Sequence, residues 1–242
     1  MDGFAGFDGI EDDLGLWPAF STAALTARAP VESLIEHPLP TLNTLLITKL
    51  SPGLDDDCVA SLRRIVEDVA AGRRGALKFL VLDFAHHVEG DSEGGEGFHR
   101  LVNEVANLIL RAPIVAVACV RADLSGADLE LALACSMVIA EDGRRFHFMG
   151  DPVVSLATYG FLSQKIGFVR AERLMERGDS VAAVQMHEMM LVKALLEPGS
   201  GFAGVEQFLA RTARRHNSCY GIYRAQRIAA PALDDDLDAQ IA

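Results

Sequence analysis

Two residues in one short stretch have the types and spacing of an active site. Gly126 stands at the turn after an apolar run, and Glu130 is a carboxylate inside a helical segment whose other residues are nearly all apolar. An acid in the first turns of a helix is favourable by about 0.3–1 kcal/mol without any catalytic role. Burial among Leu129, Leu131 and Leu133 would instead raise the pKa of Glu130 toward the range useful for proton transfer. The residues alone leave both interpretations open.

The segments that must position this stretch alternate between strand and helix. The segment 77–84 is a predicted core strand, and the continuous apolar run at 114–120 is typical of a strand in a sheet covered on both faces. Intervening helices make the connections parallel. Helices are predicted from Asp55, with Gly72 following the end, and over 98–110, where apolar residues recur at helical spacing. The fold class is therefore α/β.

The remaining segments are predicted from local patterns. Strands at 31–36 and 42–50 flank a turn at 37–40 and predict a hairpin, because prolines end strand pairing. Later elements follow in order: a short strand at 145–148, helical spacing over 155–177 broken near Gly167, a helix from Ser180, a strand at 192–195, and helices at 205–214 and 220–228. We expect an N-terminal arm over 1–30, a core over 31–200 and a helical C-terminal region over 201–242.

Composition excludes several classes of protein. The formal net charge of −12 over 242 residues argues against nucleic-acid binding, which requires clustered Lys and Arg. No apolar run reaches the roughly 18–20 residues that span a bilayer, and the acidic first residues lack a secretory signal, so we expect a cytoplasmic protein. The four cysteines show no C-x-x-C spacing, which predicts buried free thiols.

Other catalytic or binding motifs are absent from the sequence. No Ser-His-Asp order, P-loop or G-x-G-x-x-G motif is present. The run from His86 to Asp91 brings imidazoles and carboxylates together, but adjacent histidines in an extended segment point apart and no spacing matches a closed zinc site. We therefore predict no metal.

The stretch around Glu130 resembles a known family. The segments Pro113-Ile-Val-Ala-Val, Gly126-Ala-Asp-Leu-Glu and Leu131-Ala-Leu-Ala-Cys are similar to the P-[VI]-x-A strand, G-G-G-x-E turn and L-A-L-x-C helix of the crotonase (enoyl-CoA hydratase/isomerase) superfamily. Within it, Tyr159-Gly-Phe-Leu-Ser-Gln-Lys-Ile and Gly204-Val-Glu-Gln resemble the diffusible-signal-factor synthase branch. The similarity extends from about residue 42 to the end of the chain.

The resemblance implies a fold, an assembly and a chemistry. The fold is a crotonase-like ββα spiral with a helical C-terminal region, assembled as a homotrimer or hexamer. The substrate is an acyl thioester of coenzyme A or acyl carrier protein, with no further cofactor. In this family two backbone N–H groups stabilise the thioester oxygen, which gains charge only along the reaction and is met by fixed amides without reorganisation. The expected reaction is hydration, dehydration or hydrolysis of the thioester.

The family's motifs also assign roles by position. The N–H of Ala127, three residues before the family glutamate, is one donor of the oxyanion hole. The loop segment Gly94-Gly95-Glu96 matches the family's G-[GA]-D, so Gly95 supplies the second donor, and Gly94 and Gly126 contact the substrate. Glu130 takes the place of the first catalytic acid. Asp128 has no family role, and we expect it to face solvent or to bond within its turn.

The second acid of the family is where this sequence departs from the pattern. The family's L-P-E stretch is replaced by Phe146-His-Phe-Met-Gly-Asp-Pro152, in which Asp151 falls within about one position of the missing glutamate. Gly-Asp-Pro is also a typical turn. We take Asp151 as the candidate second acid, and His147 and Tyr159 as candidate substrate-binding residues. The alternative is a non-catalytic homologue that binds an acyl thioester or a protein.

Overall fold

The structure is a computed structural model that describes residues 33–51, 53–86, 97–148, 152–178, 180–215 and 220–222. All of them belong to one unit, which runs from Glu32 to Ala242. The predicted N-terminal arm over 1–30 lies outside the described residues. The boundaries proposed between arm, core and C-terminal region therefore stay predictions.

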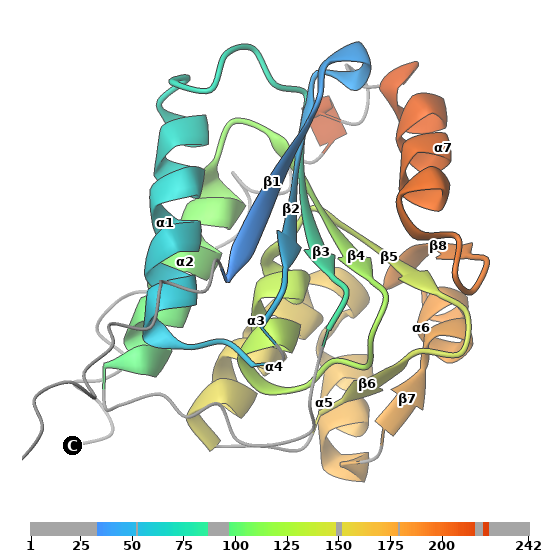
Figure 1. Ribbon diagram of the computed structural model, residues 1–242. Helices are drawn as coiled ribbons and strands as arrows, with labels where there is room; N and C mark the ends of the chain where they lie inside the picture. The colour runs from blue at the N-terminus through green and yellow to red at the C-terminus, as the bar shows by residue number, and fades with distance from the viewer. Residues whose placement is uncertain are drawn as a thin grey trace, which may run out of the picture. The chain divides into compact units, whose positions relative to one another are not determined.

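A six-stranded sheet lies at the centre of this unit (Figure 1). Its strands, in spatial order, are β1 (Leu34–Leu39), β2 (Thr44–Lys49), β3 (Phe79–Phe84), β4 (Val115–Val120), β5 (Met137–Glu141) and β8 (Val192–Leu196). β1 is antiparallel to β2, and every other neighbouring pair is parallel. Two short strands, β6 (Arg145–His147) and β7 (Ser180–Ala182), form a separate antiparallel pair. The predicted parallel sheet is confirmed.

The helices cover both faces of the sheet. They are α1 (Asp56–Ala70), α2 (Phe98–Arg111), α3 (Gly126–Ala134), α4 (Pro152–Ile166), α5 (Phe168–Arg177), α6 (Ala183–Glu188) and α7 (Gly201–Ala213). In Figure 1, α1 and α2 lie on one side of the sheet and α7 on the other. The described elements thus form three layers, with the sheet between helices on its two faces.

The side chains of each strand point alternately to the two faces of the sheet, which explains these layers. On β3, Phe79 and Val81 pack with α7, while Leu80 and Leu82 pack into the larger core with α1 and α2. Successive side chains of a strand point to opposite faces, so a strand covered on both sides must be apolar throughout. All six residues of β3 and of β4 are buried; β4 is apolar throughout, and β3 is apolar except for Asp83.

The first hairpin is confirmed, but its turn lies later than predicted. β1 continues through Pro38 to Leu39, and a 3-10 turn, η2 (Pro40–Leu42), ends at Asn43, whose φ is 46° and whose N–H donates to the Pro40 carbonyl at 3.1 Å. β1 is an edge strand, so the missing N–H of a proline need not interrupt the ladder. The expected turn at 37–40 is wrong for this reason.

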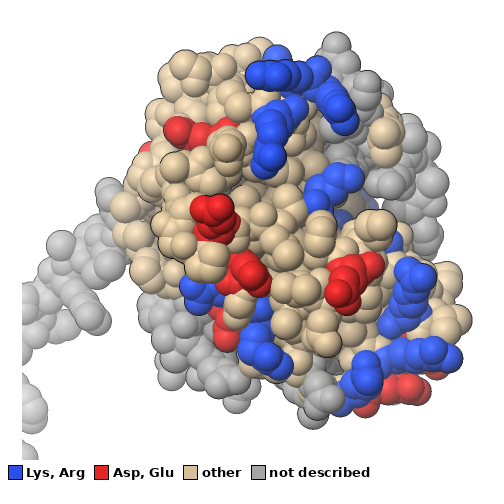
Figure 2. Space-filling view, turned by 90° about the vertical axis from the view of Figure 1, so that its right-hand side faces the viewer, with Lys and Arg blue, Asp and Glu red and all other residues tan. Residues whose placement is uncertain are grey.

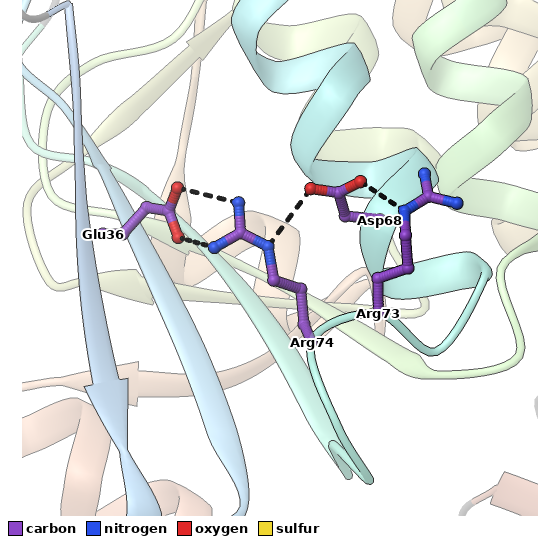
Figure 3. A network of polar contacts seen from close by, with 4 residues as sticks. All are labelled: Glu36, Asp68, Arg73 and Arg74. Atoms are coloured by element: carbon purple, nitrogen blue, oxygen red, sulfur yellow. Dashed lines mark hydrogen bonds and ion pairs between the residues drawn. The ribbon is translucent and has the colours of Figure 1, made fainter.

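A surface network ties this edge strand to the end of α1 (Figure 3). The Arg74 guanidinium donates to both carboxylate oxygens of Glu36 at 2.7 and 3.2 Å, and its Nε donates to Asp68 at 3.3 Å. Arg73 donates to the other oxygen of Asp68 at 2.7 Å. Solvent screens such exposed pairs, so they position β1 more than they stabilise the fold.

The helix predicted from Ser180 is wrong at its start. Ser180 to Ala182 form β7, which pairs with β6, and α6 begins only at Ala183. The Arg145 side chain also donates to the hydroxyl and the carbonyl of Ser180, at 2.8 and 2.9 Å. These partners are 35 residues apart in sequence, so local spacing could not reveal them.

The other C-terminal predictions have mixed outcomes. α4 and α5 are separated at Gly167, as predicted, and α7 begins at Gly201, four residues before the predicted start. Residues 220–222 are helical, and the rest of the helix predicted over 220–228 lies outside the described residues. Cys58, Cys119 and Cys135 are buried free thiols, as expected. Among the described helices, none is long and apolar enough to cross a membrane.

Candidate active site

Polar side chains collect where parallel strands β2, β3 and β4 end. Thr48 pairs with Asp83 in the register of β2 and β3, and Arg121 follows the last residue of β4. In open α/β sheets the carboxyl ends of the strands are the usual place for ligands, because the loops that follow them diverge. The helix that carries Glu130, α3, begins a few residues after Arg121.

Asp83 is the centre of one polar network at this edge. It is 1 % exposed, accepts two hydrogen bonds from Arg121 at 2.7 and 2.5 Å, and accepts a third from the Thr48 hydroxyl at 3.0 Å. The bond to Asp83 raises the pKa of Arg121 above its usual high value, so its guanidinium is charged at any physiological pH. This network joins three neighbouring strands at the edge of the candidate site.

The turn before α3 contains a glycine with positive φ and lies at the N-terminus of the helix. Gly126 has φ of +53°, a conformation that costs other L-residues about 1–2 kcal/mol, and Ser125 before it is extended. The N–H of Ala127 lies in the first turn of α3, where no carbonyl of the helix can accept it. Positive charge of the helix dipole gathers at the same end. The role of Ala127 as an oxyanion donor stays a prediction.

The segment just before this turn is hydrogen-bonded to the short strand β6. Leu124 donates to the Arg145 carbonyl at 2.9 Å and accepts from the His147 N–H at 2.8 Å, which forms an isolated bridge beside β6. His147 is thus brought next to the turn of Gly126 and Ala127. Its ring Nε2 lies 3.9 Å from Asp123 Oδ2, and its side chain is partly exposed.

Glu130 is buried without a partner for one of its oxygens. The residue is 2 % exposed, and within the described part of the chain its Oε1 accepts no hydrogen bond. Burial raises the pKa of Glu130 from 4.5 to about 8. The predicted rise in pKa is confirmed. At pH 7, Glu130 is therefore protonated and neutral in most copies of the protein. A neutral carboxyl can both donate and accept a proton.

The expectation that Asp128 faces solvent is wrong. Asp128 is 4 % exposed, and its Oδ2 accepts a hydrogen bond of 2.5 Å from Lys49 Nζ, which is equally buried at the end of β2. The expected orientation toward solvent assumed that nothing cationic lay opposite the first turn of α3. The two residues are 79 positions apart, so only the folded chain brings them together. Asp128 therefore anchors the turn that presents Ala127.

A small cavity adjoins this ion pair. Its volume is about 20 Å³, room for one water molecule, and Lys49 and Asp83 line it together with apolar side chains. Leu131, which follows Glu130, is one of them. The other apolar residues come from β1, β2, β3, α1 and the residues before α1: Leu34, Ile47, Leu54, Leu62, Leu82 and Phe84. The cavity is thus a mainly apolar space with two charged groups in its wall.

Of the remaining predicted site residues, one is described by the structure and three are not. Tyr159 lies in α4, is partly buried and packs against the core, and α4 itself packs on α3. Gly94, Gly95 and Asp151 lie outside the described residues, so the second oxyanion donor and the second acid stay predictions. In the part of the chain that the structure describes, no group of three or more His, Cys, Asp and Glu side chains could hold a metal.

The sequence reasoning missed Lys49, Asp83 and Arg121. A signal was present, because each is a charged residue at or next to the end of a continuous apolar strand. Charged side chains are rarely buried unless paired, so their place at the carboxyl ends of adjacent strands indicates either ion pairs or a site. Their partners could not be read from that signal.

Solved structures with a similar fold are known. A monofunctional enoyl-CoA isomerase from M. smegmatis matches with a TM-score of 0.69 and 21% identity, over 86% of this chain and 98% of that one. DspI from Pseudomonas aeruginosa matches with a TM-score of 0.68 and 21% identity, over 90% and 89% of the two chains. An enoyl-CoA hydratase/isomerase from Marinobacter aquaeolei matches with a TM-score of 0.66 and 17% identity, over 87% and 89%. No family model matches the sequence, and neither does any curated protein sequence.

These likenesses define the class of fold. The chain has the α/β crotonase fold, in which a mainly parallel sheet is covered by helices. The expectation of that fold is confirmed. Identities of 17% to 21% carry the fold alone, so the activity is argued from the site.

Proposed function

We propose that this chain is an enzyme of the enoyl-CoA hydratase/isomerase type that hydrates, dehydrates or hydrolyses an acyl thioester of coenzyme A or acyl carrier protein. Glu130 carries the proposal, because it is a buried neutral acid three residues after Ala127 and has an oxygen without a hydrogen-bond partner among the described residues. Its pKa of about 8 suits proton transfer near neutral pH. A carboxyl with a purely structural role would normally be paired at this depth.

In the proposed mechanism the thioester oxygen is held by the N–H groups of Ala127 and Gly95. Charge develops on that oxygen only during the reaction, so amides fixed in advance stabilise the transition state selectively. In hydration, the Glu130 carboxyl gives its proton to C2 of an enoyl thioester and takes one from the water whose oxygen bonds to C3. The acid is regenerated and no proton is lost or gained. Dehydration is the reverse.

Asp151 is the second acid of the proposal, and His147 and Tyr159 contact the substrate with Gly94 and Gly126. His147 is supported by its place beside the turn of Ala127, and Tyr159 by its place on the helix that packs against α3. The proposal also includes a relation to diffusible-signal-factor synthases, a homotrimeric or hexameric assembly and a cytoplasmic location, which rest on the sequence. A light-scattering mass of one chain would contradict the assembly.

The direct test is Glu130→Gln. Glutamine matches the shape and neutrality of the protonated acid but cannot transfer its proton, so the variant should fold and lose about 10²-fold or more in kcat/KM. The substrates are 2-enoyl and 3-hydroxyacyl thioesters of coenzyme A with the same acyl chain. Asp151→Asn, made separately, reports whether a second acid takes part. Turnover by Glu130→Gln at the parent's rate would refute the role of Glu130.

One observation favours a second function. Among the residues that the structure describes, the buried carboxylates Asp83 and Asp128 are both held in ion pairs, so neither is available as a second acid. A non-catalytic homologue that binds an acyl thioester or a protein would have this arrangement. Absence of turnover by the parent over a panel of thioesters, together with measurable binding of one of them, would establish that function in place of the enzyme.

A further inference from the structure

Lys49 and Asp128 form a buried ion pair at the turn that presents Ala127. Charged side chains usually lie at the surface, as those on the face of α6 and α7 do (Figure 2). The side chains of Lys49 and Asp128 are only 4% and 3% exposed, and the hydrogen bond between them is 2.5 Å long. Asp128 stands where the G-G-G-x-E pattern has its third glycine. Since a glycine could not bind Lys49, the pair is a feature of this chain beyond that pattern.

Residues 121–128, which we call the turn segment, are also held at their other end. Arg121, the first residue after β4, donates two hydrogen bonds to Asp83, and Asp83 accepts a third from the Thr48 hydroxyl. The ring of Phe202, on α7, lies over the Arg121 guanidinium with its centroid 5.3 Å from Cζ. The turn segment is therefore held by side chains at its first residue and at its last.

These two sets of contacts reach consecutive residues of β2, which point to opposite faces of the sheet. Leu46 packs into the core on the α7 side, and Ile47 packs into the core with α1 and α2. Because successive side chains of a strand alternate, Thr48 points toward α7 and Lys49 toward α1 and α2. The end of β2 therefore supports the two ends of the turn segment from opposite faces of the sheet.

The backbone of the turn segment is fixed between these ends as well. Leu124 donates to one carbonyl of β6 and accepts from one N–H of β6, at 2.9 and 2.8 Å. Ala127 lies between this residue and Asp128, so the direction of its N–H depends on the hydrogen bonds at both sides. An oxyanion donor must be in place before charge develops, and a shift of about 1 Å can cost about 10²-fold in rate.

We propose that Lys49 and Asp128 are positioning residues, which hold the Ala127 N–H in the place where the thioester oxygen acquires its charge. This inference rests on the proposed function and adds two residues to those that it uses. Neither side chain touches the substrate: Lys49 acts on Asp128, and Asp128 acts on the turn. Loss of the pair therefore lowers kcat, which depends on the transition state, and leaves KM almost unchanged.

The test removes both charges together. In K49M/D128L no charge is left buried without its partner, so the variant should keep its fold. With a 2-enoyl thioester of coenzyme A as substrate, kcat should fall about 10- to 100-fold, and KM should change by less than about 3-fold. An unchanged kcat in the folded variant would overturn the proposal, because the pair would then serve the fold alone.

The single variants show whether Lys49 acts through Asp128. K49M and D128L break the same hydrogen bond, so K49M/D128L should lose no more kcat than the more impaired single variant. Losses that multiply would overturn the proposal, because the two residues would then act separately. D128N keeps the shape of Asp128 and an oxygen that accepts from Lys49, so it should fold. Its kcat should lie between those of the parent and K49M/D128L, and a kcat equal to the parent's would also overturn the proposal.

Val69→Ala is the control for a loss of stability. Val69 is buried in the last turn of α1, which runs from the end of β2 to the start of β3, so it lies toward the opposite end of the sheet from the turn. V69A should unfold at a lower urea concentration than the parent and keep the parent's kcat. A loss of kcat in V69A as large as that in K49M/D128L would overturn the proposal, because any destabilisation would then have the same effect.

Crystal structures of the parent, K49M/D128L and V69A separate this proposal from the proposed function. Relative to the sheet, the Ala127 nitrogen should be displaced by about 1 Å in K49M/D128L and should keep its place in V69A. If the parent turns over no thioester, the proposed function fails, but this displacement still supports the positioning of the turn by the pair. An Ala127 nitrogen that keeps its place in K49M/D128L overturns the positioning role, whether or not the parent is active.

Discussion

Lys49 Nζ donates a 2.5 Å hydrogen bond to Asp128 Oδ2, and both side chains are almost fully buried, at 4% and 3% exposure. The pair joins the end of β2 to the first turn of α3, which presents the Ala127 N–H and leads into Glu130. Charges are buried at a large cost in solvation, which is offset only when the partner is well placed. The position of the turn therefore depends on both members of the pair.

Breaking this pair should destabilise the protein strongly. Lys49→Met leaves the Asp128 carboxylate buried without its cation, and the loss should be about 3–5 kcal/mol of unfolding free energy. Urea denaturation followed by circular dichroism measures it. The double variant Lys49→Met with Asp128→Leu removes both charges and should recover much of the loss. Losses that simply add would show that the two residues act independently.

Substitutions in the Asp83 network should lower the stability of the protein by amounts that follow the number of hydrogen bonds they affect. Asp83→Asn weakens two hydrogen bonds from Arg121 and removes the charge they meet, at an expected cost of about 2–3 kcal/mol. Thr48→Val, the matched change, deletes only one bond to the same carboxylate and should cost about 1 kcal/mol. Both are measured as urea midpoints at constant slope. Equal losses for the two variants would contradict the assignment of Arg121 as the main partner.

Much of the fold could be predicted because its signals are local. The apolar sequences of β3 and β4, broken only by Asp83 in β3, predict buried strands. Val59, Leu62 and Val66 on one stripe predict the helix α1. The errors occurred where pairing with a distant segment decided the structure. Ser180 is a strand residue because β6 pairs with it, and Pro38 is tolerated because β1 is an edge. Neither fact is present in the local sequence.

The features of the site could likewise be predicted where they depend on local sequence, and could not where they depend on distant residues. The turn at Gly126 and the high pKa of Glu130 follow from neighbours within a few positions, and both were predicted. Lys49 and Asp128 are 79 positions apart, and Asp83 and Arg121 are 38 apart, so their pairing depends on the order of the strands. A charged residue at the end of an apolar strand indicates that a partner exists, but only strand order identifies it.

Gly126→Ala tests the geometry of the proposed oxyanion turn. An added Cβ would meet no atom within 4 Å, so the only penalty is the φ of +53°, about 1–2 kcal/mol. If the turn shifts to relieve that strain, the Ala127 N–H moves and kcat should fall about 10- to 100-fold with little change in KM. Gly97→Ala is the control, because its φ of −86° suits alanine and no atom lies within 4 Å of the added Cβ. An unchanged kcat in Gly126→Ala would argue against an oxyanion role for this turn.

The raised pKa of Glu130 predicts how stability depends on pH. Because its pKa rises from 4.5 to about 8 on folding, the folded chain holds a proton that the unfolded chain releases between these values. The contribution of Glu130 is therefore fully present below about pH 4.5 and is lost as pH rises through 8, with a slope of at most about 1.4 kcal/mol per pH unit. Glu130→Gln cannot titrate and should lack this slope. Urea denaturation of parent and variant at pH 5, 6, 7 and 8 should show the variant gaining on the parent at each step. Parallel stability curves for the two proteins would mean that Glu130 is already ionised in the fold, and so could not be the neutral acid that the proposed hydration requires.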